Sequence, residues 1–81
     1  MKKQIAILGS TGSIGTQALQ VIEEHPDRYE AYVLTANNRV EDLIAQARKF
    51  KPEAVVIATE TKYQQLKDAL AELPIKVYAG E

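Results

Sequence analysis

The 81-residue chain lacks several residue types that would mark particular classes of protein. It has no cysteine, which excludes disulfide bonds and cysteine-ligated zinc. Glycine and proline are scarce, at four and three residues, so the composition does not suggest disorder or low complexity. Neither charge predominates, with 10 basic against 11 acidic residues. This balance provides no general attraction to nucleic acid or to an anionic membrane, and we expect neither as a partner.

Long hydrophobic runs are also missing. After Lys2 and Lys3, the apolar stretch 5–8 ends at Gly9, which is too short for the core of a signal peptide. No stretch approaches the roughly 20 apolar residues of a membrane span. We therefore expect a cytoplasmic protein. With 46% hydrophobic residues, the chain is suited to one small packed domain of thin stability.

Apolar runs alternate along the chain with amphipathic segments. The runs predict four strands, at residues 5–8, 31–35, 54–58 and 75–78. The first and third are almost wholly aliphatic, as in strands that are covered on both faces. The fourth alternates apolar and polar residues, which predicts a place nearer the sheet edge.

Three amphipathic segments predict helices between these strands. Their apolar residues recur at helical spacing and form three stripes: Ile14, Ala18, Val21, Ile22; Val40, Leu43, Ile44, Ala47; and Leu66, Ala69, Leu70, Leu73. Pro26 and Pro52 end the first two helices, and Thr61 with Gln64 has the spacing of a capping box at the third. We expect His25 at a helix end, the acidic residues on outer helix faces, and the four tyrosines packed against the core.

The alternation of strands and helices predicts a Rossmann-like parallel α/β sheet of about four strands with three helices. A complete dinucleotide-binding domain has about six strands, so residues 1–81 are interpreted as the N-terminal part of such a domain. The fourth strand could pair with the first, as in the usual order, or lie beyond the third.

Glycines at positions 9, 12 and 15 connect the first strand to the first helix. Gly9 permits the sharp turn, Gly12 leaves room for a phosphate, and Gly15 allows the helix to pack closely against the sheet. Free amides at the helix start suit a diphosphate, and hydroxyls could add hydrogen bonds from Ser10, Thr11 and Ser13. The plain alternative is a tight turn that binds nothing. No Gly-Lys-Ser/Thr follows, which argues against a phosphate-loop NTPase.

The end of the second strand bears on which dinucleotide would bind. NAD sites place a carboxylate about 20 residues past the glycines, where this chain has Thr35. The next residues are Ala36, Asn37, Asn38 and Arg39, and Arg39 offers a guanidinium for a 2′-phosphate. This pattern favours NADP over NAD. Alternatively, the two asparagines form a turn and helix cap, and Arg39 is a solvated residue.

The segment Lys3 to Gln17, with its unbroken ILGSTGSIG run, resembles the start of the 1-deoxy-D-xylulose 5-phosphate reductoisomerase family. The likeness continues through His25-Pro26, the second strand and the 50–57 stretch, and covers about the first fifth of a family member. The resemblance implies an NADPH-dependent oxidoreductase that converts 1-deoxy-D-xylulose 5-phosphate to 2-C-methyl-D-erythritol 4-phosphate in non-mevalonate isoprenoid biosynthesis. It also implies a divalent cation (Mg or Mn) and a homodimer for the full-length enzyme.

By the same resemblance, the diphosphate contacts fall on Thr11, Gly12, Ser13 and Ile14, and the adenosine-phosphate loop on Asn37, Asn38 and Arg39. Family members commonly carry Gly-Lys-Asn at that second loop, so Asn-Asn-Arg is a departure, and Arg39 is our choice for the 2′-phosphate. The family's catalytic residues and metal ligands lie beyond residue 81, so we assign none here. We expect the 81 residues alone to lack turnover and to bind NADPH weakly.

Three other interpretations remain at this point. The chain could begin another NADP-dependent dehydrogenase, such as a semialdehyde dehydrogenase. It could be a stand-alone nucleotide-sensing module that recruits a partner through a sheet edge. It could also be a structural domain with an empty loop, because fold alone does not establish function.

Overall fold

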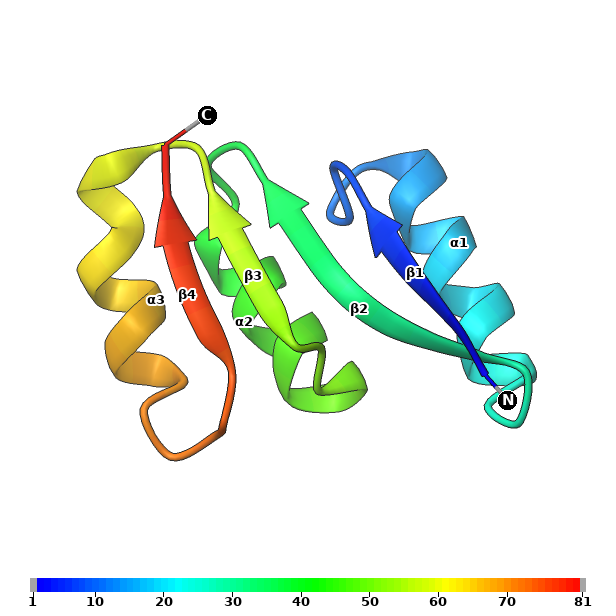
Figure 1. Ribbon diagram of the computed structural model, residues 1–81. Coiled ribbons are helices and arrows are strands. Elements are labelled where there is room, and N and C mark those ends of the chain that lie inside the picture. Colours follow the sequence, from blue (N-terminus) through cyan, green and yellow to red (C-terminus); the bar gives the residue numbers. More distant parts are fainter. Residues whose placement is uncertain (1, 81) are drawn as a thin grey trace.

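A computed structural model describes residues 2–80, and it confirms the predicted alternation of strands and helices (Figure 1). The elements are, in order, β1 (Lys3–Ile7), α1 (Ser13–Glu24), β2 (Tyr29–Ala36), α2 (Val40–Phe50), β3 (Ala54–Ile57), the 3₁₀ turn η1 (Glu60–Lys62), α3 (Tyr63–Ala69) and β4 (Lys76–Ala79).

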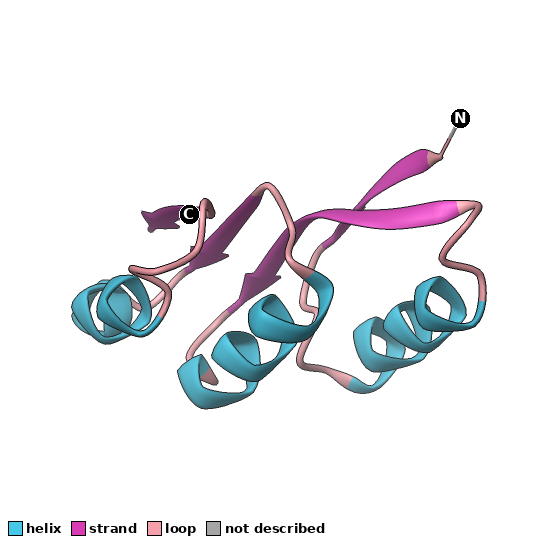
Figure 2. Cartoon of the chain, turned by 90° about the horizontal axis from the view of Figure 1, so that it is seen from below, coloured by secondary structure: helices cyan, strands magenta, loops and turns pink. Residues whose placement is uncertain are grey.

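All strand pairs are parallel, and the sheet order is β1-β2-β3-β4. The fourth strand therefore lies beyond the third, at the sheet edge. Each crossover moves one strand further in the same direction. Because such crossovers are right-handed, all three helices lie on one face of the sheet, as Figure 2 shows.

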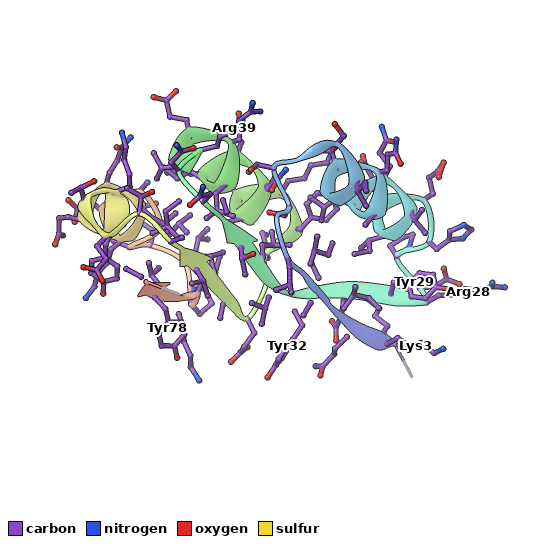
Figure 3. All side chains as sticks on the ribbon, turned by 90° about the horizontal axis from the view of Figure 1, so that it is seen from above. Lys3, Arg28, Tyr29, Tyr32, Arg39 and Tyr78 are labelled. Carbon is purple, nitrogen blue, oxygen red and sulfur yellow. The ribbon has the colours of Figure 1, made fainter. Side chains whose placement is uncertain are left out.

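The opposite face of the sheet is open, which corrects the prediction that the first strand is covered on both sides. Ala6 is exposed within β1, and Leu8 follows the strand with 80% of its surface exposed. Tyr32 and Tyr78 point from this open face away from the helices (Figure 3), and are 40% and 52% exposed. The prediction of core packing was thus wrong for these two tyrosines, whereas Tyr29 and Tyr63 pack against the core.

The core lies between the sheet and its helices. Leu34, Val55 and Ile57 are fully buried on the strands, and Leu43 and Leu66 meet them from the helices. The predicted stripe on α2 is confirmed, since its members are buried or pack against the core. Among residues 2–80, no helix combines the length and apolar character that a membrane crossing requires.

The apolar face of α1 differs from the prediction. Of the four predicted residues, Ile22 is buried and Ala18 packs against the core, whereas Ile14 and Val21 are exposed. Gly15 and Leu19 are buried as well. A glycine adds nothing to a hydrophobic pattern, yet Gly15 faces the preceding loop at close range. The face of α1 that turns inward therefore contains Gly15 beside Leu19 and Ile22.

The start of α3 also differs from the prediction, because no capping box forms. Lys62 is the N-cap and makes no side-chain cap hydrogen bond. Gln64 instead donates from Nε2 to Oδ1 of Asp68, at 2.7 Å. A turn of 3₁₀ helix precedes α3, so Thr61 lies outside the capping position. His25, by contrast, is the C-cap of α1 as predicted.

Candidate dinucleotide-binding site

The loop between β1 and α1 leads into a helix whose first backbone amides have no partner within that helix. Gly9 has φ of +73°, a conformation that glycine adopts without strain. The Gly12 amide donates to the Gly9 carbonyl at 3.1 Å, and the Thr16 amide donates to the Gly12 carbonyl at 2.9 Å. The amides of residues 13–15 precede that first helical bond, so no carbonyl within α1 accepts from them. These amides are suited to an anion.

The other two glycines have different steric environments. A Cβ on Gly15 would lie 2.6 Å from Cα of Ser10 and 2.9 Å from the carbonyl carbon of Gly9. Such distances leave no room for any side chain. A Cβ on Gly12 would make only an ordinary contact, 3.5 Å from the Gly9 carbonyl oxygen. The packing of the loop therefore requires Gly15, and Gly12 leaves open space in front of the loop.

The loop hydroxyls divide into one that is buried and two that are accessible. Ser10 is 0% exposed, and its Oγ donates to Oε1 of Gln46 at 2.7 Å. The prediction that Ser10 could contact a phosphate is therefore wrong, because its hydroxyl points into the protein. Thr11 is half-buried and Ser13 is exposed, so both remain accessible. Ile14 is 83% exposed beside them.

Thr35 at the end of β2 holds the loop in place. Its Oγ1 accepts a hydrogen bond from the Gly9 amide at 2.9 Å, and its carbonyl accepts one from the Ser10 amide at 2.8 Å. The position where a carboxylate would mark NAD is thus occupied by a hydroxyl that bonds to the protein itself.

The residues between β2 and α2 form an exposed polar loop. The Asn37 carbonyl accepts from the Thr59 amide, and the Asn38 carbonyl accepts from the Val40 amide, each at 2.9 Å. Arg39, not an asparagine, is the N-cap of α2, and it makes no side-chain cap hydrogen bond. Its side chain is 67% exposed, and its guanidinium lies 3.9 Å from the Asp42 carboxylate. Such an exposed and distant pair leaves Arg39 available to an anion.

A second cation lies near this loop, and the sequence reasoning missed it. Lys62 of η1 lines a hollow of about 270 Å³ together with Asn38 and Arg39. Because β2 and β3 pair in parallel, the segments that follow these two strands lie at the same end of the sheet, where the carboxyl ends of the strands meet. The sequence alone does not indicate that Lys62 lies beside the loop at residues 37–39, because that neighbourhood depends on the strand order of the sheet.

A larger hollow of about 450 Å³ runs along the carboxyl ends of the strands. It is lined by Gly9 after β1, Asn37 after β2, Ala58 after β3 and Gly80 after β4, together with Leu8, Thr35, Ala36 and Val56. Open α/β sheets bind ligands outside the carboxyl ends of their strands. The predicted loops at 11–14 and 37–39 both lie at these carboxyl ends.

The chain's similarity to known proteins extends over nearly its whole length. The family model for 1-deoxy-D-xylulose 5-phosphate reductoisomerase matches residues 5–81. The chain belongs to this reductoisomerase family. It is 86% identical over 79 residues to the reductoisomerase of Bacteroides thetaiotaomicron, which covers 98% of this chain and 20% of that protein. With the Porphyromonas gingivalis reductoisomerase it shares 61% identity over 80 residues, or 99% of this chain and 21% of that protein.

Solved reductoisomerase structures share the fold. The Zymomonas mobilis reductoisomerase in complex with NADPH matches with a TM-score of 0.94 at 40% identity, over 99% of this chain and 21% of that one. A reductoisomerase in complex with NADPH, fosmidomycin and magnesium matches with a TM-score of 0.90 at 37% identity, over 98% of this chain and 20% of that one. The chain thus spans about a fifth of the length of the reductoisomerases that it matches.

Proposed function

We propose that residues 1–81 are the N-terminal part of an NADPH-binding Rossmann domain, in an oxidoreductase that converts 1-deoxy-D-xylulose 5-phosphate to 2-C-methyl-D-erythritol 4-phosphate. The observation that carries this proposal is the glycine loop. Its front is open at Gly12 and its first helical amides have no partner within α1, in a chain that matches an NADPH complex with a TM-score of 0.94.

The diphosphate would be held at the start of α1. The amides of residues 13–15 supply N–H donors, and the positive end of the helix dipole favours negative charge there. Accessible hydroxyls of Thr11 and Ser13 add two more donors, and the exposed side chain of Ile14 borders the loop. Gly12 lets the backbone approach the ligand closely. This assigns a role to each residue predicted at 11–14.

The 2′-phosphate would be held at the start of α2. Arg39 supplies a fork of donors, Lys62 supplies a second positive charge, and Asn37 and Asn38 supply neutral amides. Glu41 and Asp42 also lie in the first turn of α2. The positive charges of Arg39 and Lys62 therefore have to balance these two carboxylates as well as the phosphate. NADPH supplies a hydride, and the residues of this chain hold and orient it.

The metal and the substrate belong to other parts of the proposed enzyme. Within residues 2–80, no three side chains of His, Cys, Asp or Glu come together to hold a metal ion. We assign the Mg or Mn ligands, the substrate contacts, the catalytic residues and the homodimer contacts to parts of the enzyme outside this chain.

The test is an NMR titration of the ¹⁵N-labelled chain with NADPH and, separately, with NADH. We expect both to shift the amides of residues 11–14, and only NADPH to shift those of residues 37–39 strongly. Equal responses to both cofactors would support the diphosphate loop and contradict the 2′-phosphate assignment. A folded sample that responds to neither would contradict cofactor binding by this chain.

A charge-matched pair of variants refines the test. Arg39→Gln should weaken NADPH binding by about tenfold, as expected for one charge-assisted contact, and leave NADH binding unchanged. Arg28→Gln removes the same charge just before β2, at the opposite end of this strand from Arg39, as the labels in Figure 3 show. It should alter neither affinity. Equal losses in both variants would indicate a general effect of net charge.

A further inference from the structure

We infer that Gln46 is a positioning residue for the diphosphate loop, acting through Ser10 and without contact to the cofactor. This inference rests on the proposed function, because it concerns the same cofactor site. Gln46 lies in the middle of α2, 36 residues from Ser10 in the chain, and it matches no nucleotide-binding motif.

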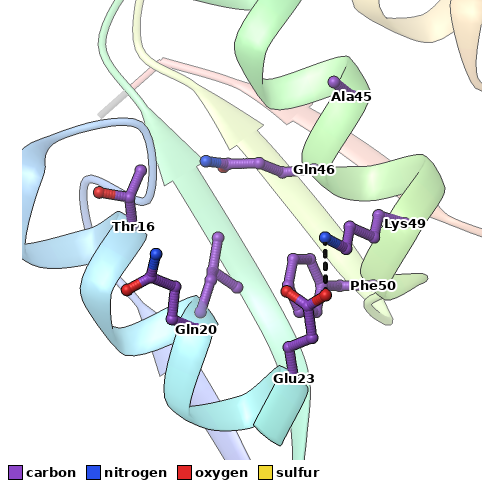
Figure 4. Close-up of a pocket in the computed structure, with 8 residues that line it drawn as sticks. Thr16, Gln20, Glu23, Ala45, Gln46, Lys49 and Phe50 are labelled. Atoms are coloured by element: carbon purple, nitrogen blue, oxygen red, sulfur yellow. Dashed lines mark ion pairs between the residues drawn. The ribbon is translucent and has the colours of Figure 1, made fainter.

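The amide of Gln46 makes two complementary hydrogen bonds with one residue. Ser10 Oγ donates to Gln46 Oε1 at 2.7 Å, and Gln46 Nε2 donates to the Ser10 carbonyl at 2.9 Å. The side chain thus accepts from the hydroxyl of Ser10 and donates to its backbone. In Figure 4, Gln46 extends from α2 toward the start of α1 and the loop that precedes it.

Burial makes these bonds important for the loop. Ser10 is 0% exposed, so water does not reach its hydroxyl. A buried hydroxyl or carbonyl without a partner is unfavourable. Gln46 supplies the nearer acceptor for the Ser10 hydroxyl, which also lies 3.3 Å from the Thr35 carbonyl oxygen, and it supplies a donor to the Ser10 carbonyl. Thr35 completes the arrangement by accepting from the amides of Gly9 and Ser10. We call Ser10, Thr35 and Gln46 the loop clamp.

The loop clamp also links the two halves of the proposed site. Gln46 belongs to α2, which begins directly after the loop at residues 37–39. The hydrogen bonds therefore fix the glycine loop relative to the helix that follows the 2′-phosphate loop. Loss of the clamp should mainly disturb the glycine loop, which contacts the diphosphate common to NADPH and NADH. The two cofactors should then be affected by the same factor.

The first arm of the experiment uses the ligand-free, ¹⁵N-labelled 81-residue chain. In Gln46→Leu we expect the amides of Gly9 and Ser10 to shift and to exchange with solvent about tenfold faster, the factor equivalent to one net hydrogen bond. The Ala58 amide, bonded to the Ala36 carbonyl at 2.9 Å, serves as the internal reference and should change little. Equal acceleration at all three amides would indicate general destabilisation and would overturn the inference.

The matched control is Gln20→Leu. Gln20 lies on α1 and lines the groove between α1 and α2 that Gln46 also lines, a hollow of about 290 Å³, but Gln20 is exposed. This variant should leave the Gly9 and Ser10 amides unchanged. If Gln20→Leu and Gln46→Leu give the same response, the effect comes from an apolar side chain in the groove, and the inference is wrong.

The second arm measures affinity. We expect Gln46→Leu to weaken NADPH and NADH by the same factor, about tenfold, whereas Arg39→Gln affects NADPH alone. Unchanged affinities in a folded Gln46→Leu chain would overturn the inference. If the unmodified chain binds neither cofactor, the proposed function is contradicted, and the ligand-free arm still decides whether Gln46 positions the loop.

A smaller change guards against failure to fold. Ser10→Ala removes the hydroxyl without adding volume and keeps the carbonyl that Gln46 Nε2 contacts. It should give a response in the same direction as Gln46→Leu and about half as large on a logarithmic scale. In the double variant Ser10→Ala with Gln46→Leu, the losses should be less than additive. Strictly additive losses, or a silent Ser10→Ala, would contradict the clamp.

Discussion

At the scale of single residues, the three glycines of the loop meet three different requirements. Gly9 adopts a positive φ of 73°, whereas a Cβ there would find open space. Gly15 has no room for a Cβ because backbone atoms of Gly9 and Ser10 adjoin it. Gly12 meets neither restriction, so its lack of a side chain benefits only what lies in front of the loop. The spacing of the motif therefore combines two requirements of the fold with one of the proposed ligand.

This difference predicts opposite outcomes for two alanine substitutions. Gly15→Ala should destabilise the chain by about 1–3 kcal/mol, because rigid backbone must move to admit the methyl group. Gly12→Ala should leave the urea midpoint nearly unchanged and weaken NADPH and NADH alike. Urea unfolding and cofactor titration of both variants check this. A stable Gly15→Ala chain, or a Gly12→Ala chain with normal affinity, would contradict these assignments.

The same loop shows where sequence reasoning succeeds at this scale. Local backbone requirements follow from residue type, so the sharp turn at Gly9 could be predicted from a nine-residue run. A glycine was also expected at position 15, but for close packing against the sheet, whereas the atoms that exclude a Cβ belong to Gly9 and Ser10 of the loop. The burial of Ser10 could not be predicted, because its partner Gln46 lies 36 residues away and only the tertiary fold brings them together.

At the scale of elements, the predictions were most accurate where one apolar stripe determines the packing. The stripe on α2 was right because Val40, Leu43 and Ala47 all face the core. On α1 the stripe was right for Ile22 and Ala18 and wrong for Ile14 and Val21, because the inward face passes instead through Gly15 and Leu19. The position of β4 was left open by the sequence, since right-handed crossovers are compatible with a step in either direction across the sheet.

The end of α2 supplies a prediction about stability. Lys51 is the C-cap, with φ of 50° and ψ of 58°, and its amide donates to the Ala47 carbonyl at 2.8 Å. A side chain in this left-handed conformation is strained, and glycine is not. Lys51→Gly should raise the free energy of unfolding by about 0.5–1 kcal/mol, after allowing for the greater freedom of glycine in the unfolded chain.

The control for this prediction is Lys51→Ala, which removes the charge and keeps the Cβ. It should not stabilise the chain. Chemical denaturation of the three proteins decides between strain and charge. If alanine stabilises as much as glycine, the effect comes from removal of the lysine side chain, and backbone strain at position 51 does not contribute.

At the scale of the whole molecule, the sheet has its three helices on one face, whereas parallel sheets are usually covered on both. The open face carries exposed Tyr32 and Tyr78, and the hollow along the carboxyl ends of the strands has no metal-binding cluster within the part of the chain that the structure describes. The chain also spans about a fifth of the length of its relatives. The proposed function implies a division of labour, in which this unit holds the cofactor and other residues of the enzyme carry out the chemistry.

The division of labour predicts the activity of a chimera. When these residues replace the matching fifth of the Bacteroides thetaiotaomicron reductoisomerase, at 86% identity, the chimera should oxidise NADPH in the presence of 1-deoxy-D-xylulose 5-phosphate and magnesium. Introducing Arg39→Gln into it should raise KM for NADPH by about tenfold with little change in kcat, because the 2′-phosphate lies far from the transferred hydride. The isolated 81-residue chain should show no turnover. Turnover by the chain alone, or an inactive chimera that is folded, would contradict the division.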